Sequence, residues 1–299
     1  MTTMTDMPPE TIFYEGRAGA PLAVFVHGLG MDHRFWSAPS EACMLDGQYP
    51  LLSLAPGLDA RAKTSFSDLR ETGFGVITWS QSQPVGPLAG AVDELAALID
   101  RFAAHAKAGV ILIGHSRGGL VARLYLESAA AVSVNIKGLL TISAPHHGTS
   151  LAEWSSHLSP VASLLGNFMG GGSAHSEFKW MVDFFGSEGH SELAPGSPLF
   201  SRLRDVKREG VRCVSIGATR PDLIHMAGHS PADLHARWMQ FMMPEELQDG
   251  MGDGLVSARS AVLPYGDEHR NFSANHLSVA FDPLVRAYVA DFSRSFLRP

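Results

Sequence analysis

One serine in this 299-residue sequence stands in a segment suited to nucleophilic chemistry. Residues 114–118 read GHSRG, so that Ser116 is flanked two positions away by Gly114 and Gly118. The apolar run VILI precedes this pentapeptide, and a segment with helical periodicity follows it. In such a strand–turn–helix unit a tight, strained turn projects the serine hydroxyl above the edge of a sheet, and the glycines avoid clashes with neighbouring backbone. The pattern predicts Ser116 as a nucleophile.

A general base must activate this hydroxyl, because serine is a weak nucleophile at neutral pH. In the strand–turn–helix arrangement the acid and then the base follow the serine along the chain. His276, in ANHL just before a final helical segment, fits the base. His269, in the polar stretch GDEHR, is the alternative and has the surroundings of a solvated loop residue. We therefore predict His276 as the base.

The carboxylate that orients the base has several candidates. Asp253 lies between two glycines in GDGLVS, and Asp222 follows an apolar run more closely in RPD. Asp249 and Asp267 are weaker candidates. Because a loop aspartate is often only a turn or cap residue, position alone does not choose between Asp253 and Asp222.

The negative charge that develops on a carbonyl oxygen during acyl transfer needs two backbone N–H donors. Each such donor contributes on the order of a few kcal/mol. One donor is expected from Arg117, directly after the nucleophile, and the other from Leu29 in the loop HGLG at 27–30. This oxyanion hole would use main-chain atoms only.

The elements that must position these residues alternate along the chain. Short apolar runs predict strands at 22–26, 51–54, 75–79, 110–113, 136–142 and 211–216. Apolar residues spaced three to four apart predict helices from about 32, at 88–105, at 120–127 and at 284–297. Continuous apolar strands separated by helices predict an α/β fold with a mostly parallel central sheet covered on both faces.

The segment 151–192 interrupts this alternation. It is rich in apolar side chains and contains three consecutive glycines at 170–172. We interpret it as a helical lid over a binding cleft, because insertions between strands commonly carry function. The expected organisation is one hydrolase core built from 1–150 and 193–299, with 151–192 as the lid. The lid residues expected to bind substrate are Trp154, Leu165, Phe168, Met169, Trp180 and Phe184.

Five blocks together resemble the bacterial true lipases and related esterases of the α/β-hydrolase superfamily. They are VFVHGLG, IGHSRGG, TISAPHHGTSLA, GDGLVS and NHL, in the order in which those lipases carry similar blocks. The resemblance spans roughly Val24 to His276 and implies the α/β-hydrolase fold with a mobile lid. The match of GDGLVS to the acid block favours Asp253 over Asp222.

The sequence also departs from that family. Ser278 stands where the calcium-binding lipases have an aspartate, so we predict no calcium. His146 and His147 are adjacent but lack a ligand set with recognisable spacing, and we predict no metal and no cofactor. Arg117 replaces the histidine of many such lipases; since only its amide is required, we expect no effect on activity.

The charge and composition of the chain limit the classes of partner that it can bind. The net charge is −7 and no Lys/Arg cluster occurs, which argues against nucleic acid and anionic membranes as partners. No apolar run approaches the roughly 18 residues of a membrane span, and the N-terminus has no signal-peptide pattern, so we expect a cytoplasmic protein, or a secreted one if a signal was removed. Cys43 and Cys213 lie far apart in the chain, and sequence alone leaves a disulfide between them open.

The resulting hypothesis is a serine hydrolase acting on small-molecule or lipid esters with hydrophobic acyl groups. Transient contact of the lid with a lipid interface is part of it. The same catalytic residues would also serve an acyltransferase or a polyester or lactone hydrolase. A more remote alternative is a non-catalytic ligand-binding homologue.

Overall fold

The computed structural model describes residues 10–45, 47–54, 62–152, 187–222 and 244–297. The strands are β1 (Thr11–Tyr14), β2 (Leu22–Val26), β3 (Cys43–Met44), β4 (Tyr49–Pro50), β5 (Gly75–Trp79), β6 (Val110–His115), β7 (Ile136–Ile142), β8 (Arg212–Ala218) and β9 (Glu268–Phe272). The α-helices are α1 (Arg34–Ser37), α2 (Leu51–Leu54), α3 (Ser65–Glu71), α4 (Leu88–Arg101), α5 (Arg117–Glu127), α8 (Glu188–Ser191), α9 (Pro198–Arg202) and α11 (Pro283–Arg294). Single 3-10 turns occupy Ala103–His105, Ala129–Ala131, Glu245–Leu247, Ser278–Ala280 and Ser295–Leu297.

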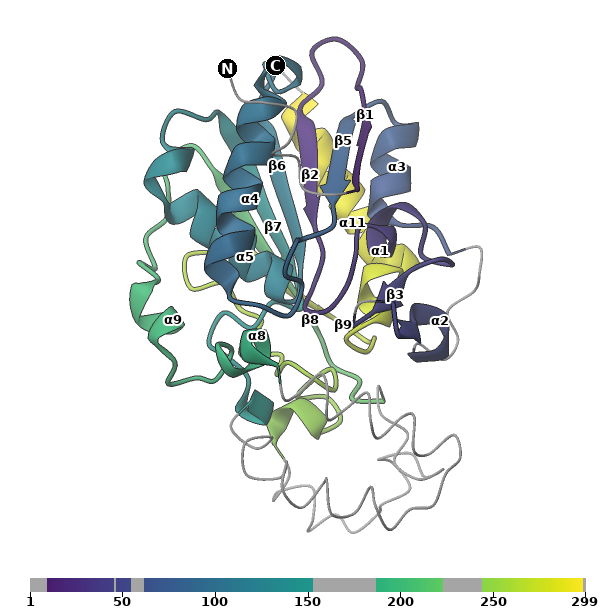
Figure 1. The fold of residues 1–299 in the computed structure, drawn as a ribbon, viewed down its shortest axis with the longest axis vertical. Coiled ribbons are helices and arrows are strands. Elements are labelled where there is room, and N and C mark those ends of the chain that lie inside the picture. The colour runs from purple at the N-terminus through teal and green to yellow at the C-terminus, as the bar shows by residue number, and fades with distance from the viewer. Residues whose placement is uncertain (1–9, 46, 55–61, 153–186, 223–243, 298–299) are drawn as a thin grey trace.

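A seven-stranded sheet forms the centre of the molecule, in the order β1-β5-β2-β6-β7-β8-β9. β1 pairs antiparallel with β5, and every other pair in this sheet is parallel. Helices α4 and α5 cover one face, whereas α1, α3 and α11 cover the other (Figure 1). The predicted α/β architecture, with a mostly parallel sheet between helices, is therefore confirmed.

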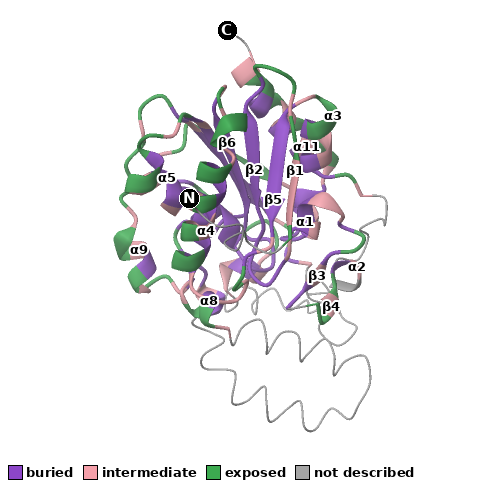
Figure 2. Ribbon diagram, turned by 45° about the horizontal axis from the view of Figure 1, so that its top comes forward, coloured by how far each residue is buried: buried purple, intermediate pink, exposed green. Residues whose placement is uncertain are grey.

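Alternate residues of the central strands fill two separate hydrophobic cores. In β2, Leu22, Val24 and Val26 face the core beneath α4 and α5, while Ala23 and Phe25 face the core beneath α1, α3 and α11. Because both faces of β2 are buried, its sequence LAVFV is apolar throughout instead of alternating. Figure 2 shows the buried strands at the centre and exposed residues on the outer sides of the helices.

The predicted and observed elements differ at several places, and the short strands β3 and β4 and the helices α3 and α9 were not predicted. The run 51–54, predicted as a strand, is helix α2, and periodicity alone cannot separate strand from helix in so short an apolar run. The edge strands β1 and β9 were not predicted. β9 reads EHRNF, with no residue fully buried, so it lacks the apolar signature of the inner strands.

Segments on both sides of the expected lid contribute to one sheet, since β8 and β9 extend the sheet begun by β1 to β7. The six predicted lid residues lie outside the described residues, within 153–186. Among the described helices, none combines the length and apolar character of a membrane span.

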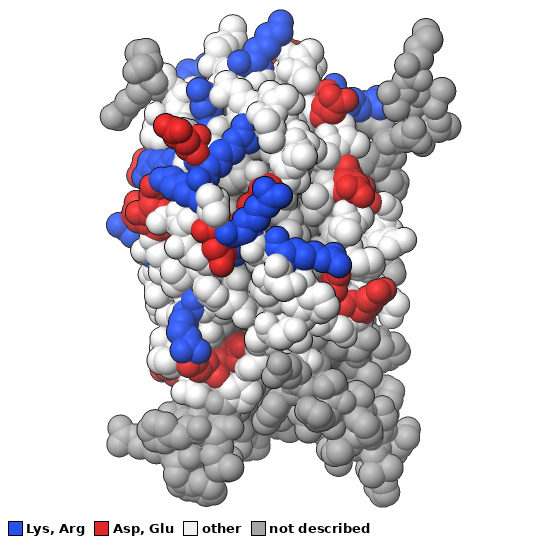
Figure 3. Space-filling model, turned by 90° about the vertical axis from the view of Figure 1, so that its left-hand side faces the viewer, with Lys and Arg blue, Asp and Glu red and all other residues white. Residues whose placement is uncertain are grey.

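Charged side chains of both signs are mixed over the surface. Figure 3 shows Lys and Arg beside Asp and Glu on the side of the molecule that it displays. Ion pairs such as Arg286–Asp68 (2.7 Å) and Arg212–Glu268 (3.5 Å) follow this mixed pattern. The exposed pair Arg212–Glu268 contributes little to stability, whereas Arg286–Asp68 is more buried and has two hydrogen bonds.

Candidate active site

A sharp turn between β6 and α5 carries the serine. Ser116 has φ 55° and ψ −130°, a conformation that non-glycine residues rarely adopt and that costs on the order of 1–3 kcal/mol. A Cβ on Gly118 would lie 2.4 Å from the carbonyl oxygens of both Val26 and His27, so a side chain there would collide with the end of β2. Ser116 itself keeps 8% exposure. The turn thus presents a strained serine at the carboxyl edge of the sheet.

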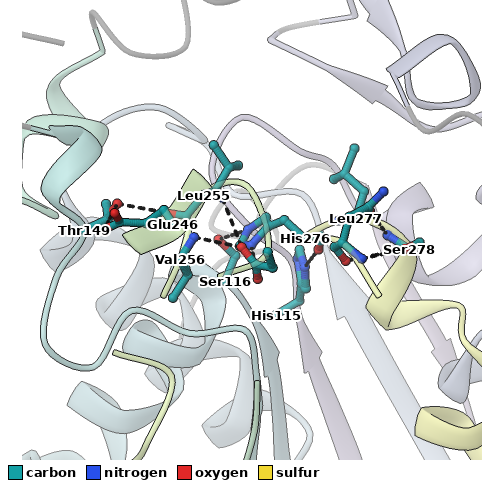
Figure 4. A network of polar contacts seen from close by, with 11 residues as sticks. His115, Ser116, Thr149, Glu246, Leu255, Val256, His276, Leu277 and Ser278 are labelled. Carbon is teal, nitrogen blue, oxygen red and sulfur yellow. Dashed lines mark hydrogen bonds and ion pairs between the residues drawn. The ribbon is translucent and has the colours of Figure 1, made fainter. Parts of the chain in front are cut away.

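Three predicted residues lie in one hydrogen-bonded chain (Figure 4). Ser116 Oγ is 2.9 Å from His276 Nε2, and His276 Nδ1 is 2.9 Å from Asp253 Oδ2. In the neutral tautomer that suits both contacts, Nδ1–H donates to the carboxylate and Nε2 accepts from the serine hydroxyl. His276 and Asp253 are 2% and 1% exposed, which shields both contacts from water. The arrangement can remove the serine proton and stabilise the resulting imidazolium.

The Asp253 carboxylate is fixed from its other side. Its Oδ1 accepts the backbone N–H groups of Leu255 (3.0 Å) and Val256 (2.8 Å). The N–H of His276 donates to the Asp253 carbonyl at 2.9 Å, so the acid and base loops are joined through the main chain as well. Side chain and backbone together hold the carboxylate toward the imidazole.

The alternative residues lie elsewhere. His269 is on β9, with Nδ1 2.8 Å from Ser215 Oγ and Nε2 3.0 Å from Asn271 Oδ1. Asp222 forms an ion pair with Arg220 at 2.7 Å. Asp249 is exposed, and Asp267 accepts hydrogen bonds from Lys207 and from the N–H of Cys213.

The predicted oxyanion loop lies against the nucleophile. A Cβ on Gly28 would be 3.1 Å from Ser116 Cβ, which places the loop directly beside the serine. Within the described residues nothing accepts a hydrogen bond from the amide of Leu29 or of Arg117. Buried amides are normally satisfied, so two unpaired N–H groups near one serine suit an incoming oxyanion.

His115 is part of the site although the sequence did not single it out. Its Nε2–H donates to the carbonyl oxygen of His276 at 2.8 Å, and its ring stacks on Phe35 at 4.8 Å. Burial holds the pKa of His115 well below its usual value, and the neighbouring His276 lowers it further. The neutral ring is therefore a permanent donor that supports the loop of the base. Its position next to Ser116 was the available signal.

Glu246 was likewise not predicted and anchors the acid loop. Its carboxylate accepts hydrogen bonds from the Ser150 N–H (2.8 Å), the Ser150 hydroxyl (2.7 Å) and the Thr149 hydroxyl (3.2 Å). The Thr149 hydroxyl also lies 2.8 Å from the carbonyl of Leu255, and Glu246 O accepts from the Gly254 N–H at 2.8 Å. The buried carboxylate thereby connects the loop after β7 to the loop of Asp253.

Ser278 closes the turn that follows the base. Its hydroxyl accepts the N–H of Asn275 at 3.0 Å, and Asn275 Oδ1 accepts the N–H of Ser278 at 2.8 Å. The position where the sequence departs from calcium-binding lipases thus has a local structural use.

Paired histidines and cysteines elsewhere do not form a ligand set. His146 is buried with Nε2 2.9 Å from Thr141 Oγ1, whereas His147 is exposed. In the part of the chain that is described, no cluster of three or more His, Cys, Asp or Glu could hold a metal ion. Cys43 and Cys213 are both free, and burial raises the pKa of the Cys213 thiol to about 12.

Comparisons with known proteins agree with this architecture. Residues 88–183, about a third of the chain, match the family model of a PGAP1-like alpha/beta domain. The crystal structure of a mature lipase from Bacillus licheniformis superposes with a TM-score of 0.61 at 17% identity, covering 96% of this chain and 98% of the lipase. The chain has the α/β-hydrolase fold. The predicted α/β-hydrolase fold is therefore confirmed.

Two further solved structures resemble this chain over most of its length. A metagenomic carboxyl esterase has a TM-score of 0.53 at 16% identity, covering 95% of this chain and 74% of the esterase. A lipase-esterase related protein from Clostridium acetobutylicum has a TM-score of 0.52 at 11% identity, covering 95% and 99%. No curated protein sequence matches this chain. Identities this low describe the shared fold and do not transfer a substrate.

Proposed function

We propose that this α/β-hydrolase cleaves carboxylic esters through an acyl-enzyme formed on Ser116. The observation that carries the proposal is the continuous chain from Ser116 Oγ through His276 to Asp253, with both contacts at 2.9 Å. Among the described residues nothing accepts from the amides of Leu29 and Arg117 beside the serine, and these two donors add the second requirement of acyl transfer. The names of the similar structures, a lipase and a carboxyl esterase among them, support the same class of reaction.

In the proposed mechanism His276 Nε2 takes the hydroxyl proton as Ser116 Oγ attacks the ester carbonyl. Asp253 holds the imidazole in the required tautomer and stabilises its positive charge. The amides of Leu29 and Arg117 donate to the oxyanion of the tetrahedral intermediate. The alcohol leaves with the proton from His276. Water, deprotonated by the same histidine, then attacks the acyl-enzyme and releases the carboxylic acid.

We further propose that the acyl group is hydrophobic and that segment 151–192 sets this preference as a lid on a core built from 1–150 and 193–299. The support is its composition, which is rich in Phe, Met, Trp and Leu. A lid of this composition would also make transient contact with a lipid surface.

The test is hydrolysis of p-nitrophenyl esters from acetate to palmitate by the parent protein and by Ser116→Ala. We expect turnover by the parent, a rise of kcat/KM from acetate to medium or long chains, and loss of turnover in the variant. Equal hydrolysis by parent and variant would remove Ser116 from the reaction. Transfer of the acyl group to an added alcohol in preference to water would reassign the protein to the acyltransferases.

A further inference from the structure

The Arg117 side chain is completely buried, at 0% exposure, beside the proposed oxyanion hole. Its two terminal nitrogens donate to neutral oxygens, Nη1 to Gln81 Oε1 and Nη2 to the Gly86 carbonyl at 2.7 Å. Burial lowers the pKa of Arg117 to about 10, so the guanidinium still carries its charge at neutral pH. The nearby carboxylates of Glu192 and Glu94 offset part of the cost of burying this charge, but among the described residues neither contacts the guanidinium, so the charge remains costly to keep. The sequence-based expectation that only the amide of this residue matters therefore does not explain the side chain.

Gln81 connects Arg117 to the oxyanion loop through hydrogen bonds to His27. Its Nε2 donates to the carbonyl of His27 at 3.2 Å, and its backbone N–H donates to His27 Nε2 at 3.2 Å. Burial lowers the pKa of His27 to about 4, so the ring is neutral and can accept at Nε2. The residue that begins the loop HGLG is thus held at both its main chain and its side chain.

The same segment, 81–86, also holds the other end of this loop. The N–H of Gly30 donates to the carbonyl of Pro84 at 2.9 Å. Arg117 binds the segment at its first and last residues, Gln81 and Gly86, and Pro84 lies between them. Leu29 stands between His27 and Gly30, so the loop is fixed on both sides of the Leu29 amide to a segment that Arg117 contacts at its two ends.

We infer that Arg117 contributes to the oxyanion hole twice: its own amide is one donor, and its side chain, through segment 81–86, positions the second donor at Leu29. The inference rests on the proposed function. It makes Arg117 and Gln81 positioning residues, whose loss leaves the nucleophile and its base in place but displaces the Leu29 amide from the developing charge. Ground-state binding of the ester changes little, because the oxyanion exists only during the reaction.

The test compares Arg117→Met with Arg123→Met. Both arginines belong to α5 and are 0% exposed, but Arg123 binds Glu127 (2.9 Å) and Asp205, away from the oxyanion loop. Methionine keeps an unbranched stem and leaves the backbone amide present. For Arg117→Met we expect kcat on p-nitrophenyl butyrate to fall about 10- to 100-fold with KM changed less than about threefold. Arg123→Met should lower Tm but keep the kcat of the folded enzyme.

A trifluoromethyl ketone inhibitor adds a readout that loss of stability does not move. It forms a hemiketal oxyanion on the nucleophile, so its Ki should rise in Arg117→Met by the factor by which kcat falls. Gln81→Met should reproduce both changes, and it covers the case in which Arg117→Met does not fold. The double variant should lose no more than the larger single loss, because both substitutions break one connection.

Failure of the proposed function and failure of the inference about Arg117 give different results. A parent protein without esterase activity overturns the proposed function and this inference with it. A parent that is active, with Arg117→Met and Gln81→Met keeping their kcat and Ki, overturns the inference alone. An equal fall of kcat in folded Arg123→Met would also overturn it, since the effect would then follow the loss of any buried arginine.

Discussion

The two ends of the parallel strands are built in different ways. At the amino ends of β2 and β6 the connections are held by main-chain hydrogen bonds: the N–H of Leu22 donates to the carbonyl of Gly109 at 2.9 Å, and the N–H of Val110 donates to the carbonyl of Asn135 at 2.8 Å. At the carboxyl ends of β2 and β6, the buried side chains of His27, His115 and Arg117 hold the loops, and Ser116 has a positive φ. Buried polar groups and strained backbone lower the free energy of unfolding, and in β2 and β6 they lie at the carboxyl ends of the strands.

We therefore expect the apolar interior and the carboxyl edge of the sheet to respond differently to substitution. Changes in the apolar interior should lower stability and spare turnover by the folded protein. Changes at the carboxyl edge should lower turnover by more than they lower stability. Four experiments test this expectation, and the largest effect is expected for the acid of the proposed catalytic chain.

Asp253→Asn should have the largest effect. The asparagine can keep its contacts to the amides of Leu255 and Val256, but it favours the wrong tautomer of His276, and we expect kcat to fall about 10⁴-fold with little change in Tm. Steady-state kinetics and thermal unfolding measure the two quantities. Asp222→Asn, at the rejected alternative, is the control and should behave as the parent. Similar losses in both variants would contradict the assignment of the acid.

Leu95→Ala tests the interior. Leu95 is fully buried on α4 in the core shared with α5. Removing three buried carbon atoms should lower the free energy of unfolding by about 2–5 kcal/mol. At a temperature where the variant is folded, kcat should equal that of the parent. Denaturant unfolding and esterase assays on the same sample measure the two quantities. A large loss of kcat would contradict the expectation that interior substitutions spare turnover.

Glu246→Gln examines the anchor of the acid loop. The amide can accept fewer of the donors from Ser150 and Thr149, so the Asp253 loop should loosen and kcat should fall about tenfold, because small misplacements at a site are costly. Glu245→Gln is the matched control, since Glu245 is only partly buried and lies 3.7 Å from Arg259. If both variants keep full kcat, Glu246 serves stability alone.

Lowering the pH should lower the stability of the protein, because its buried histidines are neutral. Burial lowers the pKa of His27 and of His190 to about 4 from an unfolded value of 6.5. Between these values the unfolded chain binds more protons, so stability is fully present above pH 6.5 and falls as the pH drops toward 4, by about 1.4 kcal/mol per pH unit and histidine. Tm measured from pH 7.5 to 4.5 should fall, and His190→Gln should flatten the slope. A constant Tm would contradict the neutral buried rings.

The inner strands could be predicted because burial on both faces requires continuous apolar runs, as in β2 and the first four residues of β6. The edge strand β9 could not, because its residues are half exposed and polar. Ser116 and His276 were identifiable from local pattern and chain order, and the structure brings them together. Asp253 needed a motif match, because a loop aspartate has no periodicity.

The contacts around the site were beyond sequence reasoning for a physical reason. Gln81 and His27 are 54 positions apart, and each is a polar residue in a loop. Such residues resemble solvated loop positions until the fold buries them. From sequence alone only the backbone amide of Arg117 has an evident use, so a role for its side chain could not be predicted.

Covalent labelling shows whether Ser116 is the activated nucleophile. A fluorophosphonate should modify the parent protein once, and peptide mass spectrometry should locate the adduct on Ser116. Labelling of His276→Ala should be at least about 10²-fold slower, because the base that activates the hydroxyl is gone. An adduct on another residue, no adduct on Ser116, or an unchanged rate in His276→Ala would contradict the proposed catalytic chain.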